Sequence, residues 1–389
     1  METLLEYHNR ALDGIESQFH RYMYNKIDWT AQLIGLIGSR GVGKTTLILQ
    51  KIKEDFIGDK VLYVNVEGFY FANHTLVELA ESIEKQGYTR LFIDEVHRYP
   101  EWSRELKLIY DFHPRLKVVF TGSSILDIKR GVSDLSRRAL MYSMQGLSFR
   151  EYLSMNHGIT APLYDLEQVI GGEPAHMHLP TPLIYFNEYL KRGYYPFMNA
   201  PGYTEKLNQV INQTLEVDIP AFARLNASKG YQLKRLMAII AESVPFKPNM
   251  TKIANIIGVS RNDIGDYFDF MEEAGMIMQL RDTTHGIRAL GKPDKVYLEN
   301  SNLIYALSPG NANIGNVRET FFLNQLRVGY PVKSSRISDF EIGGRTFEIG
   351  GANKGQSQIV GAKEGYVVKD NIETAYSNVI PLWYFGLIY

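Results

Sequence analysis

The chain has 389 residues, and at roughly 150 residues per domain this length predicts two or three domains. Lys and Arg number 42 and Asp and Glu 43, so the formal net charge is -1, which excludes a histone-like, strongly basic protein but leaves room for a local basic patch. There is no cysteine, so the chain has no disulfide, thiolate nucleophile, thiolate zinc site or iron–sulfur cluster of its own.

The two ends of the chain do not read as targeting or membrane segments. The first residues, METLLEYHNR, mix charged with apolar side chains and lack the continuous apolar stretch of a secretory signal. A membrane-spanning helix needs roughly 20 apolar residues. The longest apolar run, the C-terminal IPLWYFGLIY, is shorter, and we predict a buried terminal strand there. We therefore expect a cytoplasmic protein with no membrane partner.

The predicted elements begin with a helical lead-in over residues 1–30. In residues 31–150, short apolar runs alternate with helical patterns. The runs are QLIGLIG, VLYVNV, RLFIDE, LKVVFTG and ALMYSM. Continuous apolar strands separated by helices indicate a parallel sheet covered on both faces, so we predict an α/β fold for this region.

The pattern changes beyond this region. Residues 151–228 carry Tyr and Leu at helical spacing, and residues 229–290 are typical of short helices around a turn. In residues 291–389 the β-branched and aromatic residues return, with Gly-Gly pairs that favour turns. We take these ranges as the predicted domain boundaries.

The strongest motif is GSRGVGKT at residues 38–45, which fits G-x-x-x-x-G-K-[ST] between an apolar strand and a helical run. Glycines let backbone N–H groups wrap a phosphate, and the helix N-terminus adds positive potential. We predict that Lys44 reaches the β- and γ-phosphates of ATP and that the Thr45 hydroxyl binds Mg²⁺. The predicted nucleotide-binding residues are Gly38, Ser39, Arg40, Gly41, Val42, Gly43, Lys44, Thr45 and Thr46. A solvent-facing role explains Arg40 equally well, and the alternative for the whole motif is a chance Gly-rich turn.

A second motif, LFIDE at residues 91–95, supplies two carboxylates after an apolar strand. In a parallel sheet this strand end meets the edge where the phosphate loop lies. We predict that Asp94 holds Mg²⁺ through water and that Glu95 polarises the attacking water. An Asp-Glu pair at this position favours hydrolysis over binding alone. For His97, just downstream, we favour a surface position over contact with the nucleotide or with a neighbour.

The next strand, LKVVFTGSS, ends in polar residues. In the additional-strand arrangement of ATPases with these two motifs, which this chain resembles, the corresponding strand lies between the two motif-bearing strands. A polar side chain at its end would then touch the γ-phosphate or the lytic water. Ser123 is the predicted residue and Thr121 the second choice. A turn after a strand also favours Ser and Gly, so a structural role stays open.

Together these segments resemble a known family. GSRGVGKTT, LFIDEVHRYPEW, VVFTGSS, LSRRALMYSMQGLSFREYL, GYYP, KVYLENSNLIYAL and NVRETFFLNQL resemble the bacterial and archaeal AAA-type ATPases that carry a C-terminal domain of restriction-endonuclease-like fold. The resemblance implies ATP and Mg²⁺ binding, a helical and winged-helix middle, and a C-terminal α/β domain related to PD-(D/E)xK nucleases.

The resemblance also implies a role for an arginine before the last strand of the ATPase region. LSRR stands where the family usually has Leu-x-Gly-Arg, so Arg138 corresponds to the family arginine and Arg137 replaces the glycine. An arginine there stabilises charge on the transferred phosphoryl group. In an oligomer, Arg137 and Arg138 would make this contact with a neighbouring chain. An Arg pair at a helix end is equally explained as a favourable partner of the helix dipole.

Residues 249–280 match the spacing of a helix-turn-helix. The second helix carries Arg261 against Asp263, Asp266 and Asp269. Three carboxylates facing phosphates would repel DNA, so we favour a structural or protein-contacting winged helix over a DNA reader.

In the C-terminal region the resemblance places the nuclease carboxylates at Glu319, Asp339 and Glu348. The position two after Glu348, where that family carries its lysine, is Gly350. We therefore predict a degenerate site that does not cut DNA. Lys354 is a possible replacement from the loop, and solvated carboxylates that cap turns are the alternative.

The hypothesis from the sequence is a Mg²⁺-dependent, ATP-hydrolysing AAA-type ATPase that acts as a switch or motor on an unidentified protein partner. One alternative is a nucleic-acid-binding protein or nuclease gated by ATP, against which Gly350 and the near-neutral charge argue. The other is a nucleotide-binding scaffold for protein interactions, against which Glu95 argues.

Overall fold

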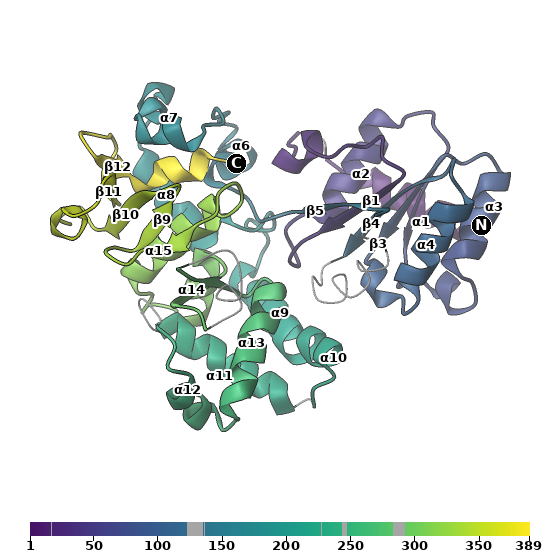
Figure 1. Ribbon diagram of the computed structural model, residues 1–389. Helices are drawn as coiled ribbons and strands as arrows, with labels where there is room; N and C mark the ends of the chain where they lie inside the picture. The colour runs from purple at the N-terminus through teal and green to yellow at the C-terminus, as the bar shows by residue number, and fades with distance from the viewer. Residues whose placement is uncertain (17, 123–134, 136, 227, 243–246, 283–291) are drawn as a thin grey trace. The chain divides into compact units, whose positions relative to one another are not determined.

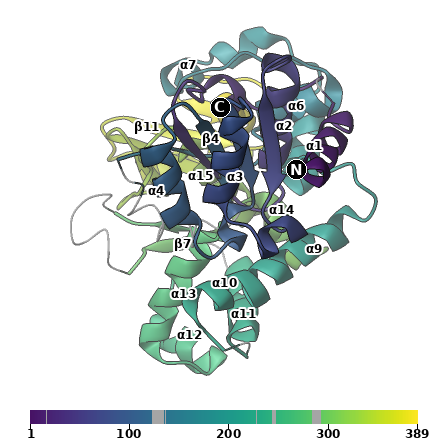
Figure 2. The same ribbon diagram turned by 90° about the vertical axis from the view of Figure 1, so that its right-hand side faces the viewer.

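The computed structural model describes residues 1–389 except 17, 123–134, 136, 227, 243–246 and 283–291. The chain divides into two compact units, Met1–Gly146 (unit 1) and Leu147–Tyr389 (unit 2). Figures 1 and 2 show them in two views. The finer division into five segments stays a prediction.

Unit 1 is built on a five-stranded sheet. Its strands are β1 (Leu33–Ile37), β2 (Val61–Asn65), β3 (Arg90–Asp94), β4 (Lys117–Gly122) and β5 (Leu140–Ser143). Their order is β2-β3-β4-β1-β5, and every neighbouring pair is parallel. The five strands expected from the apolar runs are confirmed. Because β4 lies between β1 and β3, the expected insertion of this strand is confirmed too.

Helices connect the strands of unit 1. They are α1 (Glu2–Asp13), α2 (Lys44–Asp55), α3 (Leu76–Lys85) and α4 (Trp102–Phe112), with 3-10 turns η1 (Tyr22–Asn25), η2 (Phe69–Ala72) and η3 (Val96–Arg98). Leu79 of α3 and Leu106 of α4 share one apolar core with Leu62, Leu91 and Val118 of the strands. This burial fixes the sheet, whose carboxyl ends carry the predicted site.

The first part of unit 2 is helical, as the Tyr and Leu spacing predicts. Its elements are α6 (Phe149–His157), α7 (Leu166–Ile170), η4 (Glu173–Met177), α8 (Pro182–Glu188), η5 (Tyr189–Gly193), α9 (Tyr203–Gln213), η6 (Thr214–Asp218) and α10 (Ile219–Ala223). Tyr152, Tyr189, Tyr194 and Tyr195 are fully buried among them. The abundant tyrosines of this segment therefore build core.

A helix-turn-helix follows. The elements are α11 (Ser228–Glu242), α12 (Met250–Ile257), α13 (Arg261–Glu273) and the antiparallel pair β6 (Ile277–Leu280) and β7 (Lys295–Leu298). Gly258 ends α12 with a φ of 79°, and Ser260 caps α13 by accepting a hydrogen bond from the N–H of Asp263 at 3.2 Å. Asp269 accepts a hydrogen bond from Gln279 of β6 at 2.9 Å. Two of the three α13 aspartates thus have local structural partners.

The chain ends in a second sheet. Its elements are α14 (Ser301–Leu307), α15 (Ile314–Leu326), β8 (Lys333–Ser334), β9 (Phe340–Ile342), β10 (Arg345–Gly350), η8 (Ser357–Ile359), β11 (Gly365–Lys369), β12 (Val379–Pro381) and η9 (Leu382–Leu387). The order is β12-β11-β10-β9-β8; β10, β11 and β12 are parallel, and β9 is antiparallel to both neighbours.

The expected C-terminal strand is wrong in part. The run IPLWYFGLIY is buried as expected, but only Ile380 and Pro381 belong to β12, and the chain continues as the 3-10 turn η9. Pro381 has no N–H to extend the ladder, and the chain leaves the sheet directly after it.

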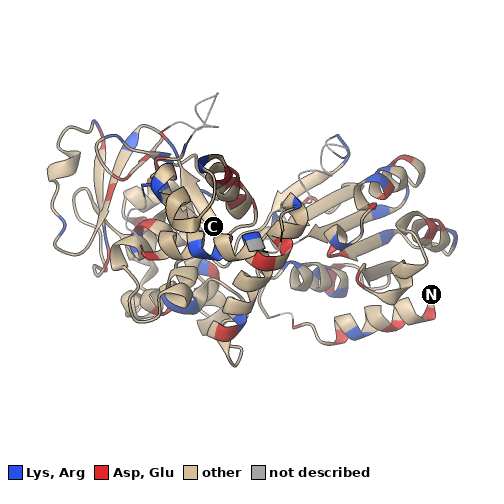
Figure 3. Cartoon of the chain, turned by 90° about the horizontal axis from the view of Figure 1, so that it is seen from below, with Lys and Arg blue, Asp and Glu red and all other residues tan. Residues whose placement is uncertain are grey.

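Basic and acidic residues are interspersed along the helices of each unit (Figure 3). Among the described helices, none combines the length and the apolar character that a bilayer span requires.

Candidate active site

The phosphate loop connects β1 to α2 in unit 1. Its first glycine, Gly38, packs so closely that a Cβ there would stand 2.3 Å from the carbonyl oxygen of Met144. Its last glycine, Gly43, has a φ of 97°, a left-handed conformation that favours glycine. Helix α2 begins at the next residue, Lys44, so its first N–H groups lie at the end of the loop. The backbone therefore has the form that the motif predicts.

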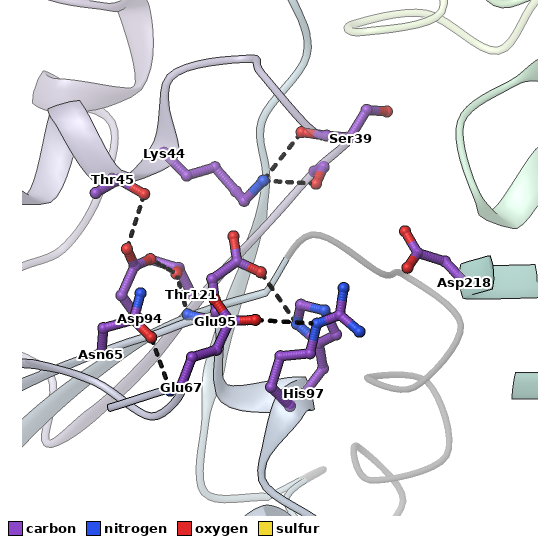
Figure 4. Close-up of polar contacts among 12 residues, drawn as sticks. Ser39, Lys44, Thr45, Asn65, Glu67, Asp94, Glu95, His97, Thr121 and Asp218 are labelled. Carbon is purple, nitrogen blue, oxygen red and sulfur yellow. Dashed lines mark hydrogen bonds and ion pairs between the residues drawn. The ribbon is translucent and has the colours of Figure 1, made fainter. Parts of the chain in front are cut away.

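Lys44 lies inside this loop (Figure 4). Its side chain is buried, and its Nζ donates hydrogen bonds to the carbonyl oxygens of Gly38 at 2.8 Å and Ser39 at 2.9 Å. Burial lowers the pKa of Lys44 to about 8, while the negative charges of Glu95 and Asp94 oppose that shift. The ammonium is thus held by neutral carbonyls of the loop itself, which lets a phosphate oxygen replace them as its partner.

Asp94, at the end of β3, is held by hydroxyl groups from three other elements. Thr45 Oγ1 of α2 and Tyr63 Oη of β2 each donate to Asp94 Oδ2 at 2.9 Å, and Thr121 Oγ1 of β4 donates to Asp94 Oδ1. Asp94 is 2% exposed. A hydroxyl carries no charge, so these bonds fix the carboxylate without neutralising it. The predicted Mg²⁺ ligands Thr45 and Asp94 therefore meet.

Glu95 has a different environment from its neighbour. Its backbone is left-handed, with a φ of 55°, which is uncommon for a residue with a side chain. Its N–H donates to Thr121 Oγ1 at 3.2 Å, and its Oε2 lies 3.5 Å from Nδ1 of His97 in η3. Its side chain is 21% exposed. The unusual backbone directs this carboxylate away from the hydroxyls that hold Asp94.

Two residues of this site differ from the sequence-based expectation. The His97 side chain is 3% exposed, so its expected surface position is wrong: η3 turns the chain back and places the ring beside Glu95. Sequence reasoning also missed Tyr63. The parallel register of β2 and β3 pairs Asn65 with Asp94, which puts Tyr63 two residues earlier on the same side of the neighbouring strand. An alternation analysis of VLYVNV against LFIDE would have found it.

Ser123 lies outside the described residues. The second choice, Thr121, is fully buried at the end of β4 and touches Asp94 and Glu95, as described above. Of the other loop residues, Val42 is buried and Thr46, on α2, is exposed.

Arg138 lies at the amino-terminal end of the strands, opposite the end that carries the phosphate loop. It precedes β5, which pairs with β1 in the parallel register Ile34 to Leu140, so Arg138 stands where strands begin and the phosphate loop stands where they end. A five-residue strand spans about 16 Å. Its guanidinium forms a two-bond pair with Asp111 of α4, at 2.8 and 3.0 Å. Arg137 is exposed beside it. Arg138 therefore does not reach the phosphate loop of its own chain.

Unit 2 brings the three predicted nuclease carboxylates to one cavity of about 630 Å³. Glu319 comes from α15, Asp339 precedes β9, and Glu348 lies in β10. Lys295 of β7, 7% exposed, donates to Asp339 Oδ1 at 2.9 Å and lies 3.5 Å from Glu319 Oε2. Burial and the charge of Asp339 raise the pKa of Glu319. A buried ammonium thus stands between two of the carboxylates.

The third carboxylate also has a lysine. Lys354 Nζ pairs with Glu348 Oε1. A Cβ on Gly350 would stand 2.4 Å from Lys354 Cγ, so the lysine stem fills the space of the missing side chain. The described residues contain no group of three His, Cys, Asp or Glu side chains arranged to hold a metal ion. The sequence-predicted residues therefore meet here as carboxylate–lysine pairs.

Comparisons with known proteins agree with the geometry of unit 1. Residues 30–153 match the family model of an AAA domain. Residues 184–318 match a family described as a domain of unknown function, which ends inside α15 and gives no support to a restriction-endonuclease-like fold. No curated protein matches the chain.

Solved structures resemble the chain at low identity. The Walker-type ATPase PABY2304 of Pyrococcus abyssi is 11% identical, over 76% of this chain and 99% of that one, with a TM-score of 0.44. AMPPCP-bound DnaA from Aquifex aeolicus is 11% identical, over 69% and 86%, with a TM-score of 0.29. The S. cerevisiae Hsp104–ADP complex is 15% identical, over 68% and 40%, with a TM-score of 0.33.

Proposed function

We propose that the chain is a Mg²⁺-dependent ATPase of the AAA type that acts as a switch or motor on a protein partner. One observation carries this proposal: the two carboxylates at the end of β3 have separate surroundings. Asp94 is buried and joined to the hydroxyl of Thr45 in the phosphate motif, whereas Glu95 stands outside that set and is partly exposed. Binding alone needs the first carboxylate; hydrolysis needs the second as well.

The residues present fit a magnesium ion, because hydroxyl and carboxylate oxygens are the donors that Mg²⁺ prefers. Thr45 would hold it directly and Asp94 through water. When bound, the ion would offset the negative charge of the phosphates.

The protein groups have distinct tasks in this mechanism. Lys44 and the loop N–H groups bind the phosphates, and Glu95 accepts a proton from water at its carboxylate. That water oxygen bonds to the γ-phosphorus while the bond from the γ-phosphorus to the β,γ-bridging oxygen breaks, which gives ADP and inorganic phosphate. His97, beside Glu95, orients the carboxylate.

Substitution of Glu95 by Gln tests this assignment. Removing the base while keeping its shape should lower the ATPase rate by about 10²- to 10⁴-fold and leave the affinity for ATP unchanged. Phosphate release and calorimetric ATP binding measure the two quantities. Glu67→Gln is the matched control. Glu67 lies after β2, near the same end of the strands, and its carboxylate pairs with Arg98 at 3.6 Å. A Glu95→Gln chain that still turns over ATP would place the base elsewhere.

Arg138 acts in this proposal on the nucleotide of a neighbouring chain. Arg138 lies at the end of the strands opposite the phosphate loop, and this position supports action on a neighbouring chain over action on the nucleotide of its own chain. The arginine would then make activity depend on assembly of several copies.

A second candidate function is DNA cleavage by unit 2. One observation favours it: the stem of Lys354 occupies the space of a side chain at Gly350, the position where the nuclease lysine is expected. Against it, Lys295 places a buried ammonium between Glu319 and Asp339, where a divalent ion would have to bind. We keep the expectation that DNA is not cut. Incubation with single-stranded, duplex and branched DNA, with Mg²⁺ or Mn²⁺ and with or without ATP, tests it. Cleavage that Asp339→Ala abolishes would make the nuclease the leading function.

A further inference from the structure

Arg21, in the segment between α1 and β1, is a buried cation that the mechanism above does not use. It is 5% exposed. Its guanidinium donates to three backbone carbonyl oxygens: those of Val42, of Gln145 at 2.7 Å and of Gly146 at 2.8 Å. A planar guanidinium with five N–H donors can serve three carbonyls at once, which an ammonium on a flexible stem does less well. Arg21 therefore joins two separate stretches of backbone.

The first stretch is the phosphate loop. Val42 contributes its C=O and Gly43 its N–H to one peptide unit, which is trans. In a trans peptide these two groups point in opposite directions. Because Arg21 holds the carbonyl, the N–H of Gly43 points away from the guanidinium. A phosphate loop works only if such N–H groups face the ligand.

The second stretch is the last part of unit 1. Met144 donates its N–H to the carbonyl of Ile37 at 2.7 Å, directly before the loop, and its own carbonyl packs against Gly38. Gln145 and Gly146, held by Arg21, follow at once. Residues 144–146, at the end of unit 1, therefore pack against the phosphate loop, and Arg21 forms hydrogen bonds to both segments.

We propose that Arg21 is a positioning residue for phosphate binding: it sets the Val42–Gly43 peptide so that its N–H faces the phosphate, and it locks the loop to residues 144–146. The inference rests on the proposed binding of ATP at this loop. Arg21 bonds to the outer side of the loop and not to the nucleotide, and Glu95 lies on another element. Its loss therefore weakens binding and leaves the hydrolytic step nearly intact.

The test compares Arg21→Lys, which keeps the charge but not the planar fork, with Arg21→Met. Arg90→Lys is the matched control, because Arg90 also donates to a backbone carbonyl in unit 1, that of Trp29 at 3.1 Å, at the start of β3. We expect both Arg21 variants to raise the Kd for a non-hydrolysable ATP analogue and the KM for ATP about tenfold or more, with kcat changed by less than about twofold. Arg90→Lys should change none of these.

The outcomes separate this inference from the proposed function. If the wild-type chain itself does not bind the analogue, the proposed function fails. If the wild-type chain binds and Arg21→Lys binds equally well, the positioning role fails alone. Amide exchange on the wild-type chain decides the matter even if the variants do not fold: the analogue should protect the amides of Gly43 and of residues 144–146 together. Protection of Gly43 without residues 144–146 would overturn the proposed link between the two stretches.

Discussion

The phosphate site of unit 1 and the carboxylate cavity of unit 2 use similar residues in opposite ways. In unit 1, Asp94 is fixed by the hydroxyls of Thr45, Tyr63 and Thr121, and Lys44 is bound to loop carbonyls. In unit 2, lysines pair directly with carboxylates, as Lys295 does with Asp339. A carboxylate held by neutral donors keeps a negative charge that can attract a bound cation. The charge of a carboxylate paired with an ammonium is already compensated by the protein itself. The first arrangement suits ligand binding and the second suits a fixed structure.

The largest effect expected from this comparison is that of Lys44→Ala. The side chain supplies charge to the phosphates and little to the core, so the variant should fold and lose all measurable ATP binding. Calorimetric titration with a non-hydrolysable analogue measures this, and circular dichroism checks the fold. Affinity like that of the wild-type chain would remove the basis for placing phosphate at this loop.

The next effect is that of Arg138→Ala, which tests whether the phosphate site is complete within one chain. If Arg138 serves a neighbour, the rate per chain should rise with protein concentration, and the variant should lose about 10³-fold or more in kcat. Mixing it with Lys44→Ala chains should restore part of the activity, because each supplies what the other lacks. A concentration-independent rate without rescue would leave Arg138 as the structural partner of Asp111.

Lys295→Met tests the other side of the comparison. Without the ammonium, the buried Glu319 and the half-buried Asp339 face each other as uncompensated carboxylates, and the free energy of unfolding should fall by about 3–5 kcal/mol. Mn²⁺ should then raise the melting temperature of the variant but not of the wild-type chain. Urea unfolding measures the first quantity. Lys234→Met is the control, because its pair with Glu216 at 2.9 Å is more exposed and should cost little. A loss as small as that of the control would show that Lys295 does not compensate these charges.

The strands and the phosphate loop of unit 1 could be predicted from sequence, and the reason is local. Its strands are continuous apolar runs, and the phosphate motif joins one of them to a helix, so residues close in sequence define the loop. Asp94 and Thr45 could be placed together because parallel strands end at one edge. Of the helix expected over residues 1–30, the described residues form only α1 and the turn η1. Tyr63 needed a comparison of the alternation in β2 with that in β3. Arg21 could not be found this way, since its contacts depend on the packing of segments far apart in the chain.

Unit 2 shows the limit of the same reasoning. The carboxylates Glu319, Asp339 and Glu348 were expected together, and they line one cavity. The lysines that neutralise them were not foreseen as a set, because Lys295 comes from β7 and Lys354 from the loop after β10. In the C-terminal run, hydropathy indicated burial correctly, but apolar residues alone do not distinguish a strand from the 3-10 turn η9.

The smallest expected effect is that of Tyr63→Phe, which removes one of the three hydroxyls that hold Asp94. The ring remains in the core, so the fold should persist. Because Thr45 and Thr121 still hold the carboxylate, the loss should be that of a single hydrogen bond to a charged group, about 1.5–3 kcal/mol at most. It should appear as a higher Mg²⁺ concentration for half-maximal ATPase activity, with ATP affinity measured without metal unchanged. Tyr99→Phe is the matched control, because its hydroxyl donates to the carboxylate of Glu105 at 2.9 Å, away from the phosphate site. If both variants shift the Mg²⁺ dependence equally, or neither does, the hydroxyl of Tyr63 has no part in positioning Asp94 for the proposed Mg²⁺.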